Sequence, residues 1–571
     1  MVQETTRPNP ALPLAPQAWI HHPPSALAGA STGALAGLRF AVKDNIDVAG
    51  WPTTAACPAF AYLPEAHASV VRRLLEAGAS VVGKTNLDQF ACGLSGTRSP
   101  YGAVPNAIHA AYVSGGSSSG SAYVVATGQV DFALGTDTAG SGRVPAGLNN
   151  IVGLKPSRGL ISAHGVVPAA QAVDCVSIFA TTVACAVRVL AAALGHDPAD
   201  PYSRPLSMAT TPLGSRFRFG VPAALEFFGD EAARAAFEGA LAQLQAMGGE
   251  AVPLDFTPLS ACADMLYGSA LVAQRHEAIR DFFDAHESEV IEPVRSIIAS
   301  GRGYSASDLV AAQTRLAELG QEAQALWQGI DLLVVPTAPT HHTIERMQAD
   351  PVALNRQLGA YTNFVNLLDY AALSVPASLR ADGLPFGITL IGRCGSDWQL
   401  AELGQRFHHA TGLTQGATGL PLPAPQPIPG LASVPSVRVA VVGAHLSGMP
   451  LNIQLTERGA TLAARTHTAA QYRLYALPRT TPPKPGLLRV APGEGQRIEV
   501  ELWDMPLAHY GSFVALVPQP LSIGTLTLAD GSTVQGFLCE PLALEGATDI
   551  THLGGWRAYV ASLAAAPVAT A

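Results

Sequence analysis

The chain has 571 residues, 48% hydrophobic and 13% charged, so it can bury large cores and is expected to form two or more domains. Its formal net charge is −9 and its 34 lysines and arginines form no dense basic run, which argues against nucleic acid as a partner. The seven cysteines are scattered, odd in number and without metal-ligand spacing, so we expect reduced thiols and neither a metal site nor another cofactor.

The first thirty residues are rich in proline and lack the basic start and apolar run of a secretory signal. No apolar stretch approaches the ~18 residues that a membrane span needs. We therefore expect a cytoplasmic protein without a membrane partner.

The first element expected to carry chemistry is a strand that ends at Lys43. The preceding Phe40, Ala41 and Val42 indicate a buried strand end, so the Lys43 side chain would reach a site from a desolvated environment. Desolvation lowers the pKa of a lysine and makes its neutral amine available as a base. A lysine after three apolar residues is more often a solvated strand end, so Lys43 alone identifies nothing.

A helix is expected over residues 68–77, which are apolar at helical spacing and stop at Gly78, and a strand is expected next. Residues 78–85 also satisfy the Walker A pattern G-x4-G-K-T. A phosphate-binding loop needs a strand before it and a helix after it, whereas here a helix precedes and a strand lies inside. The order of elements therefore disfavours nucleotide binding.

The stretch from Gly115 to Pro145 has two Gly/Ser-rich loops around one apolar segment, residues 122–127. Glycines allow a ligand close to the main chain, and serines among them can bring hydroxyls and N–H groups to one point, as a nucleophile and its oxyanion hole require. The apolar segment disfavours a flexible linker. Residues 116–120 also match the G-x-S-x-G elbow of α/β-hydrolases, but only a weak strand precedes them and no convincing Asp–His pair follows.

Three motifs make the chain resemble the amidase signature family: AVKDNIDVAG around Lys43, GGSSSGSA at 115–122 and GTDTAGSGRVPA at 135–146. Residues 83–102 and 383–392 also match, so the resemblance covers roughly residues 30–415. It implies an α/β fold with a mixed central β-sheet surrounded by helices.

The resemblance also implies a catalytic set. Lys43 is the base, Ser117 the bridging serine after a cis peptide, and Ser141, 24 residues further on, the nucleophile. Lys43 would take a proton from Ser117 and Ser117 one from Ser141, which attacks an amide carbonyl to give an acyl-enzyme. Further implied positions are the substrate-binding Gly93, the loop-bracing Asp137 and Arg143, and the oxyanion-hole N–H groups of Thr138, Ala139, Gly140 and Ser141.

Beyond these motifs, residues 170–195 are expected to be helical, 216–222 to begin a strand, and 230–248 to form an amphipathic helix that ends at Gly248. Further helices should dominate residues 254–330. Buried strands are expected at 331–339, where a proline turn follows, and near 372–379.

Tyr267 and Arg275 lie eight residues apart, about two helical turns, which would place both side chains on one helix face. An Arg fork with a Tyr hydroxyl is suited to holding a small carboxylate. Without context such a pair is more often packing and surface. The motif at 135–146 and residues 88–102 resemble the allophanate hydrolase branch of the family, which favours a substrate-binding role for the pair.

Residues 419–430 carry five prolines and predict a semi-rigid linker. We therefore divide the chain into an amidase domain (1–418), a linker (419–434) and a C-terminal domain (435–571). Strand-like runs recur in the last part, at 497–505, 511–517 and 524–540, with a possible hairpin turn at 529–531. These runs predict a small β-rich α+β domain.

The C-terminal domain resembles the one found in allophanate hydrolases, similar in fold to γ-glutamyl cyclotransferases, through residues 443–452, 501–517 and 536–551. Simple amidases lack this domain, so it is the strongest indication of substrate class. His445, His509 and Glu540 are candidates for a second chemical site, although a lone histidine is more often structural.

The sequence thus predicts a cytoplasmic allophanate hydrolase that acts on a small-molecule substrate and, by resemblance, forms a homodimer. Whether its C-terminal domain assists decarboxylation or shapes assembly stays open. One alternative is another small-amide amidase, and a second is a glutamine-dependent amidotransferase component that works with a partner on charged tRNA. A catalytically dead assembly protein fits poorly with the presence of Lys43, Ser117 and Ser141.

Overall fold

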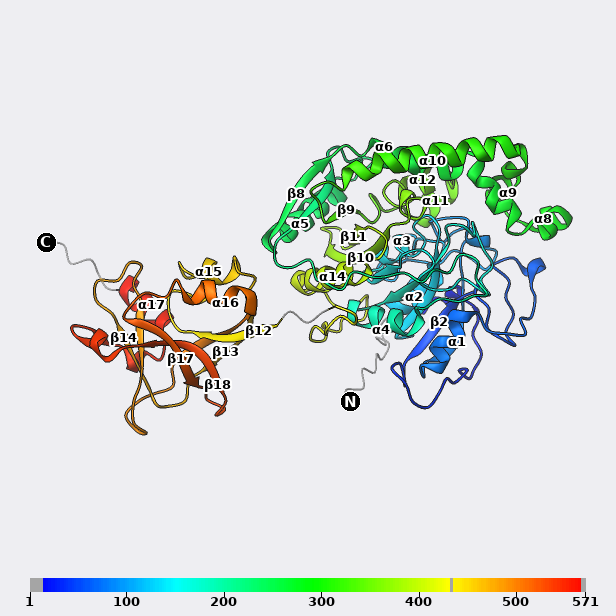
Figure 1. Cartoon of the computed structure of the whole chain (residues 1–571). Helices are drawn as coiled ribbons and strands as arrows, with labels where there is room; N and C mark the ends of the chain where they lie inside the picture. The colour runs from blue at the N-terminus through cyan, green and yellow to red at the C-terminus, as the bar shows by residue number, and fades with distance from the viewer. Residues whose placement is uncertain (1–13, 432–434, 566–571) are drawn as a thin grey trace. The chain divides into compact units, whose positions relative to one another are not determined.

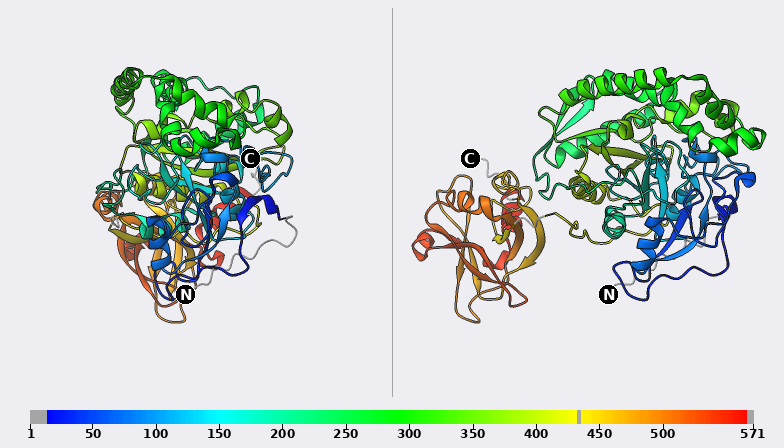
Figure 2. Two further views of the ribbon diagram at one scale, coloured as in Figure 1. Left: turned by 90° about the vertical axis from the view of Figure 1, so that its right-hand side faces the viewer. Right: turned by 45° about the vertical axis from the view of Figure 1, so that its right-hand side comes forward.

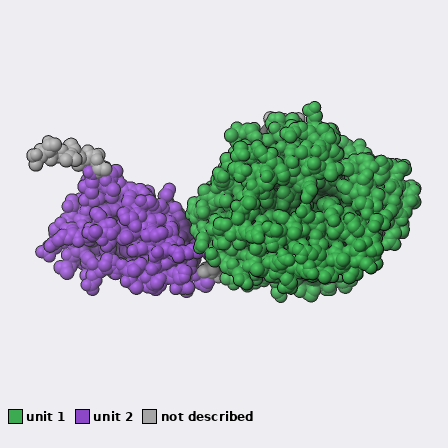
Figure 3. All heavy atoms as spheres, turned by 90° about the horizontal axis from the view of Figure 1, so that it is seen from above, with its two compact units in different colours: residues 1–213, 217–431 green, residues 214–216, 432–571 purple. Residues whose placement is uncertain are grey.

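The computed structural model describes residues 14–431 and 435–565 of the chain (Figure 1). These residues divide into two compact units: residues 14–213 with 217–431, and residues 214–216 with 435–565, coloured separately in Figure 3. The division at 431 falls inside the proline-rich segment predicted as a linker. Up to that point the segment packs on unit 1, where the Gln405 side-chain amide donates to the carbonyl of Gln426 at 2.7 Å.

Unit 1 is built on one mixed sheet of eleven strands. In spatial order the strands are β1 (Trp19–His21), β3 (Ser80–Thr85), β2 (Arg39–Lys43), β4 (Phe132–Asp137), β6 (Cys175–Ala180), β5 (Val152–Lys155), β10 (Ala371–Leu379), β11 (Pro385–Gly392), β9 (Leu332–Pro336), β7 (Phe217–Pro222) and β8 (Gly249–Leu254). β2 runs parallel to both β3 and β4, whereas β4 and β6 are antiparallel. The predicted α/β fold with a mixed central sheet is confirmed.

Separate cores fill the faces of this sheet, because successive side chains of a strand point to opposite faces. In β9, Leu332 and Val334 pack in one core, while Leu333 and Val335 pack in another. The first core is closed by α1 (Ser69–Glu76), α4 (Val183–Ala193), α5 (Glu231–Ala246) and α14 (Asp397–Thr411). The second is closed mainly by α6 (Thr257–Gly268), α10 (Ala306–Leu326) and α13 (Phe364–Leu367).

Unit 1 contains further short helices outside these two cores. They are α7 (Ala273–Glu277), α8 (Arg280–His286), α9 (Val294–Ser300), α11 (Ile344–Ala349) and α12 (Ala353–Leu358). In Figures 1 and 2, α10 runs across the top of unit 1 and α8 and α9 lie beside its N-terminal end. Ser305 and Asp308 form a capping box that fixes this end. The predicted helical character of residues 254–330 is confirmed.

The prediction of one helix over residues 170–195 is wrong. The segment forms β6, in the middle of the sheet, and only then α4, whose N-cap Thr182 accepts from the N–H of Cys185 at 3.1 Å. A strand buried on both faces is apolar along its whole length, so periodicity cannot separate it from a buried helix. The predicted helices at 68–77 and 230–248 correspond to α1 and α5, and the predicted strands to β7, β9 and β10.

The Walker-like residues 78–85 lie in the turn after α1 and in β3 itself. Lys84 is fully buried, and its Nζ lies 3.2 Å from Oδ1 of the equally buried Asp44. This lysine serves an internal ion pair, in agreement with the sequence argument against a phosphate loop.

Unit 2 has two sheets around its own core. The first contains β13 (Thr461–His467), β16 (Glu499–Pro506), β12 (Ser436–Val441), β18 (Thr533–Cys539) and β17 (Leu521–Thr527) in spatial order. The second contains β15 (Pro485–Arg489), β14 (Tyr472–Ala476) and β19 (Thr548–Asp549). Three α-helices complete the described part of the unit: α15 (Ile453–Thr456), α16 (Leu507–Val514) and α17 (Trp556–Ala565). The predicted α+β character is confirmed.

Two local predictions in unit 2 have different outcomes. The hairpin at 529–531 is confirmed, since β17 and β18 pair antiparallel and Gly531 adopts a φ of +86° in the turn. The strand predicted at 511–517 is wrong, because α16 covers residues up to Val514 and buries Phe513. Across the described ranges, no helix has the length and apolar character needed to cross a bilayer.

Candidate active site

Lys43 ends β2 in the interior of unit 1 and is fully buried. Its Nζ donates to Ser117 Oγ at 2.8 Å and to Thr136 Oγ1 at 2.6 Å. Burial lowers the pKa of Lys43 to about 7, although the carboxylates of Asp88, Asp174 and Asp137 oppose the decrease. A lysine with this pKa is substantially neutral near pH 7, as a general base must be.

Ser117 lies on the loop before α2 (Ser119–Ala126), and the Gly116–Ser117 peptide is cis, the geometry implied by the family resemblance. The packing around this peptide requires glycine, because a Cβ on Gly116 would come within 2.1 Å of Asp88 Oδ2. The N–H of Asp88 donates to the carbonyl of Ser117 at 3.0 Å. Ser117 is therefore fixed by Lys43 from one side and by the Asp88 loop from the other.

Ser141 lies on the loop between β4 and α3 (Val144–Leu148). Asp137 organises this loop: its carboxylate accepts from the N–H groups of Gly140 and Gly142 and from the Arg143 guanidinium, all at 2.9 Å. Burial by itself would raise the pKa of Asp137, but Arg143 holds it below its usual value. The pair is fully buried and braces the loop.

This arrangement narrows the predicted oxyanion hole. The N–H of Gly140 is already bonded to Asp137, whereas within the described chain no hydrogen-bond partner is seen for the N–H groups of Thr138, Ala139 and Ser141. These three are free to bind a ligand oxygen. The Ser141 hydroxyl donates to the carbonyl of Gly93 at 3.4 Å, so Gly93 lies beside the predicted nucleophile.

Two polar residues of the segment at α13, which no sequence motif indicated, hold the same loop. Thr362 donates to the carbonyl of Ala139 at 2.6 Å, and Asn366 donates to the carbonyl of Asp137 at 2.7 Å. They follow Ser141 by more than two hundred residues, and nothing in the local pattern TNFVN distinguishes them from an ordinary helix start. Thr136, the second partner of Lys43, lies inside a recognised motif and could have been noticed there.

Tyr267 and Arg275 meet, but not on one helix face. α6 ends at Gly268, and a short turn leads to α7, which carries Arg275. Arg275 Nη2 donates to the Tyr267 hydroxyl at 3.0 Å, and the guanidinium carbon lies 4.9 Å from the centre of the Tyr267 ring. The two side chains are close, as predicted, but the prediction that they share one helix face is wrong.

Arg275 is a buried cation with unused donors. The residue is 4% exposed, and its Nε and Nη1 have no hydrogen-bond partner among the described residues. A buried charge left unpaired is costly, so such a group is suited to receive an anion. Arg275 also lies close enough to Lys43 to lower the pKa of that lysine. Unit 1 thus places a buried cation with unused donors near Lys43.

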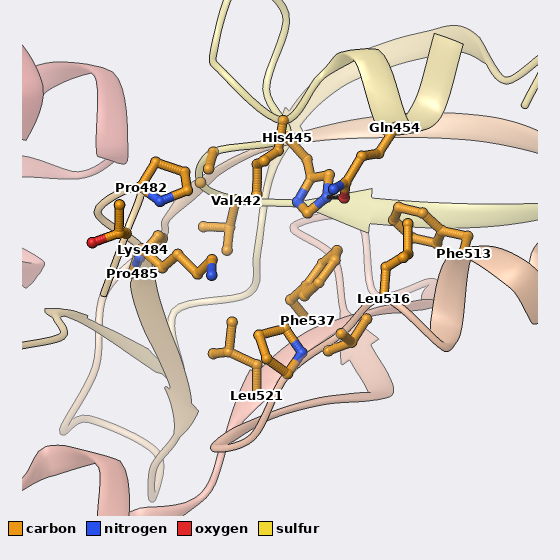
Figure 4. A pocket seen from close by; sticks show the side chains of 16 residues that line it. Val442, His445, Gln454, Pro482, Lys484, Pro485, Phe513, Leu516, Leu521 and Phe537 are labelled. Atoms are coloured by element: carbon orange, nitrogen blue, oxygen red, sulfur yellow. Dashed lines mark hydrogen bonds between the residues drawn. The ribbon is translucent and has the colours of Figure 1, made fainter. Parts of the chain in front are cut away.

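The predicted residues of unit 2 do not converge. His445 lines a cavity of about 220 Å³, bonds Gln454 at 2.9 Å and stacks on Phe537 with ring centres 5.0 Å apart (Figure 4). His509 and Glu540 are exposed and lie outside the lining of this cavity. Lys484, which the sequence analysis did not select, extends its side chain into the same space.

A family model described as Amidase matches residues 16–401, and one described as Allophanate hydrolase C-terminal domain matches residues 437–561. The chain belongs to the amidase family. It is therefore an amidohydrolase of the branch that carries this C-terminal domain. The predicted resemblance is confirmed for both parts of the chain.

Relatives support this assignment over different lengths. Urea amidolyase of Saccharomyces cerevisiae is 45% identical over 540 residues, which cover 92% of this chain and 29% of that protein. The chain thus spans less than a third of the length of this relative. A glutamyl-tRNA(Gln) amidotransferase subunit of Acidobacterium capsulatum is 33% identical over 404 residues, 65% of this chain and 84% of the relative.

Among solved structures, Kluyveromyces lactis allophanate hydrolase matches with a TM-score of 0.70 and 40% identity, over 98% of this chain and 94% of that chain. A glutamyl-tRNA(Gln) amidotransferase subunit of Thermotoga maritima matches with a TM-score of 0.60 and 28% identity, over 69% of this chain and 87% of that chain. Both the amidase fold and the presence of the C-terminal part therefore have structural counterparts.

Proposed function

We propose that this amidohydrolase hydrolyses allophanate, urea-1-carboxylate, to ammonia and carbon dioxide. The observation that carries the proposal is Arg275, a buried cation with two donors that lack partners in the described chain, beside an amidase catalytic cluster. Allophanate has a terminal amide for the nucleophile and a carboxylate for the arginine. The C-terminal family match and the 40% identity to a solved allophanate hydrolase support the same substrate.

Proton transfer begins at Lys43. Its neutral amine accepts the Ser117 proton across the 2.8 Å contact, and Ser117 in turn accepts the proton of Ser141. The Ser141 hydroxyl turns from the carbonyl of Gly93 toward Ser117 for this step. The lowered pKa of Lys43 supports its role, because a lysine at its ordinary pKa would be fully protonated at neutral pH.

Ser141 Oγ then attacks the terminal amide carbon. The oxyanion is held by the free N–H groups of Thr138, Ala139 and Ser141, each donor contributing about 3–4 kcal/mol to the stabilised transition state. Collapse of the tetrahedral intermediate expels ammonia, which takes the relayed proton, and leaves an acyl-enzyme. Water cleaves the acyl-enzyme, and the carbamate-type product breaks down to ammonia and carbon dioxide.

Arg275 holds the substrate carboxylate, and Tyr267 positions its guanidinium. The free Nε and Nη1 of Arg275 can donate two hydrogen bonds to it, while Nη2 stays on the Tyr267 hydroxyl. Charge-assisted hydrogen bonds of this type are worth about 1.5–3 kcal/mol each. This selects carboxylate-bearing amides over neutral ones.

The test is ammonia release by the purified protein from allophanate, malonamate, biuret, acetamide and glutamine, with Ser141→Ala as the blank. We expect activity with allophanate that is lost in the blank. Activity on neutral amides without activity on allophanate would support the alternative small-amide amidase. Activity on glutamine alone, and only with a partner protein, would support the amidotransferase alternative suggested by the relatives at 33% identity.

For unit 2 we propose a ligand-binding role rather than a purely structural one. The Lys484 amine and the His445 imidazole share a cavity with Gln454, Phe513 and Phe537, which suits a small anion (Figure 4). The test compares the carbon dioxide and ammonia yields of Lys484→Ala with those of wild type. An unchanged yield and rate would remove the cavity from the reaction. The cytoplasmic location and the homodimer stay predictions.

A further inference from the structure

Asp174 is a buried carboxylate that the proposed mechanism does not use. It lies directly before β6 and is 9% exposed. Its Oδ2 accepts from the N–H groups of Ala169 and Ala170 at 2.8 and 3.0 Å. Its Oδ1 accepts from the Thr138 hydroxyl at 2.5 Å. The carboxylate thus joins its own turn to Thr138, the first residue of the loop 138–143 that carries Ser141, which we call the nucleophile loop.

The bond to Thr138 is positioned to control the oxyanion hole. Thr138 follows the last residue of β4, and the N–H groups of Thr138 and Ala139 have no hydrogen-bond partner in the described chain. A short hydrogen bond to an ionised acceptor is among the strongest a hydroxyl makes. It fixes the Thr138 side chain and, through its Cα, the peptide planes on either side.

The same loop is also held by the α13 segment. Thr362 holds the carbonyl of Ala139, and Asn366 bonds the carbonyls of Asp137 and Val173, the latter the neighbour of Asp174. The turn before β6, the nucleophile loop and α13 therefore form one hydrogen-bonded assembly. An oxyanion hole is effective only if its donors are fixed before charge develops, and this assembly fixes them.

We propose that Asp174 is a positioning residue of the amidase reaction: through the Thr138 hydroxyl it holds the oxyanion-binding N–H groups in place for the tetrahedral intermediate. The inference rests on the proposed Ser141 chemistry but not on allophanate as the substrate. Asp174 acts without contacting the reacting atoms.

The charge of Asp174 gives a second, independent signature. The charged groups that influence Lys43 are Asp88, Asp174 and Asp137, which raise its pKa, and Arg275, which lowers it. Loss of the Asp174 charge lowers the pKa of Lys43 further, so more of the amine is neutral at a given pH. Loss of the Thr138 hydroxyl leaves every one of these charges in place.

The experiment is a double-mutant cycle with Thr138→Val and Asp174→Asn, with Thr138→Ser as the conservative partner. The readouts are kcat and KM for the amide that the substrate panel identifies. Each single variant should lower kcat about 10- to 100-fold with little change in KM, less than the roughly 10²–10³-fold loss from a deleted oxyanion donor. The double variant should be no worse than the poorer single one, and Thr138→Ser should recover most of the loss.

The acid limb of the pH–rate profile separates the two single variants. It should move to lower pH in Asp174→Asn and stay in place in Thr138→Val. Any of three results would overturn the proposal. The kcat of Thr138→Val could be unchanged, Thr138→Ser could fail to recover kcat, or the kcat losses of the two single variants could multiply in the double variant. Thr138→Val and Thr138→Ser decide the matter even if Asp174→Asn does not fold.

A readout independent of substrate separates failure of this inference from failure of the proposed function. Phenylmethanesulfonyl fluoride can sulfonylate an activated serine, and its second-order rate with Ser141 is followed by intact mass. We expect the rate to fall in Thr138→Val and to recover in Thr138→Ser. No labelling of wild-type Ser141 would remove the oxyanion hole on which the inference stands. Labelling of Ser141 without activity on allophanate would contradict only the substrate assignment.

Discussion

Two buried arginines, one on the nucleophile loop and one on α7, are treated differently by this fold. Arg143 is fully buried and donates two hydrogen bonds of 2.9 Å to the Asp137 carboxylate. It also donates to the carbonyl of Thr362 and to the Asn366 side chain. Arg275 is almost as buried but has one neutral partner, Tyr267, and two donors without any in the described chain. A buried cation whose donors are all hydrogen-bonded stabilises the fold, whereas one with unpartnered donors is suited to bind a ligand.

The same substitution at both sites should separate the two roles most strongly in stability. Arg143→Met leaves the buried Asp137 carboxylate without its charge partner, so we expect the free energy of unfolding to fall by about 3–5 kcal/mol. Arg275→Met removes an unpaired buried charge, so the free energy of unfolding should stay the same or rise. Urea denaturation of both variants beside wild type measures this, and equal losses would erase the contrast.

For substrate binding, in contrast to stability, we expect the larger effect at Arg275. Arg275→Met removes two charge-assisted hydrogen bonds to the carboxylate, so the KM for allophanate should rise about 100-fold or more. Steady-state ammonia release measures it. An unchanged KM would take Arg275 out of the substrate site and favour the small-amide alternative.

The pH dependence sharpens the contrast further. Activity needs neutral Lys43, whose pKa is about 7, so the acid limb of kcat/KM should have its midpoint near pH 7 and fall tenfold per unit below it. Arg275 lowers this pKa, so Arg275→Met should raise it and move the limb to higher pH. A limb that stays in place, or moves to lower pH, would show that Arg275 and Lys43 do not share a site.

The smallest effect is expected at Tyr267. Tyr267→Phe keeps the ring beneath the guanidinium at 4.9 Å and removes only the hydroxyl that accepts from Nη2. We expect the KM for allophanate to rise a few-fold with kcat nearly constant, since the hydroxyl orients Arg275 while the two donors meant for the carboxylate, Nε and Nη1, stay in place. A loss as large as that of Arg275→Met would mean that the hydroxyl itself contacts the substrate.

The sequence predicted what its local patterns encode. Ser117 and Ser141 lie in small-residue motifs, because a loop that must bring its backbone close to a ligand can use few residue types. Lys43 ends a strand whose preceding residues are apolar. The mixed sheet was implied by the resemblance that these motifs carry, and it is confirmed. The spacing of Tyr267 and Arg275 predicted that the two side chains meet on one helix. They do meet, but they lie on two helices separated by a break.

What could not be predicted depends on contacts between distant segments. Thr362 and Asn366 bond a loop more than two hundred residues away, and Asp174 precedes a strand whose apolar run resembles a helix. In unit 2, His509 and Glu540 were chosen by residue type, whereas Lys484 joins His445 only through the packing of β15 against its neighbours. No local pattern carries such information.

The central claim is that unit 1 is an amidase that recognises a carboxylate through Arg275. Allophanate and biuret test it most directly, because they differ only in carrying a carboxylate or a neutral amide at the end that Arg275 would hold. We expect wild type to favour allophanate over biuret by at least about 100-fold in kcat/KM, and Arg275→Met to lose most of that preference. Equal use of both compounds by wild type, or an undiminished preference in the variant, would contradict the account.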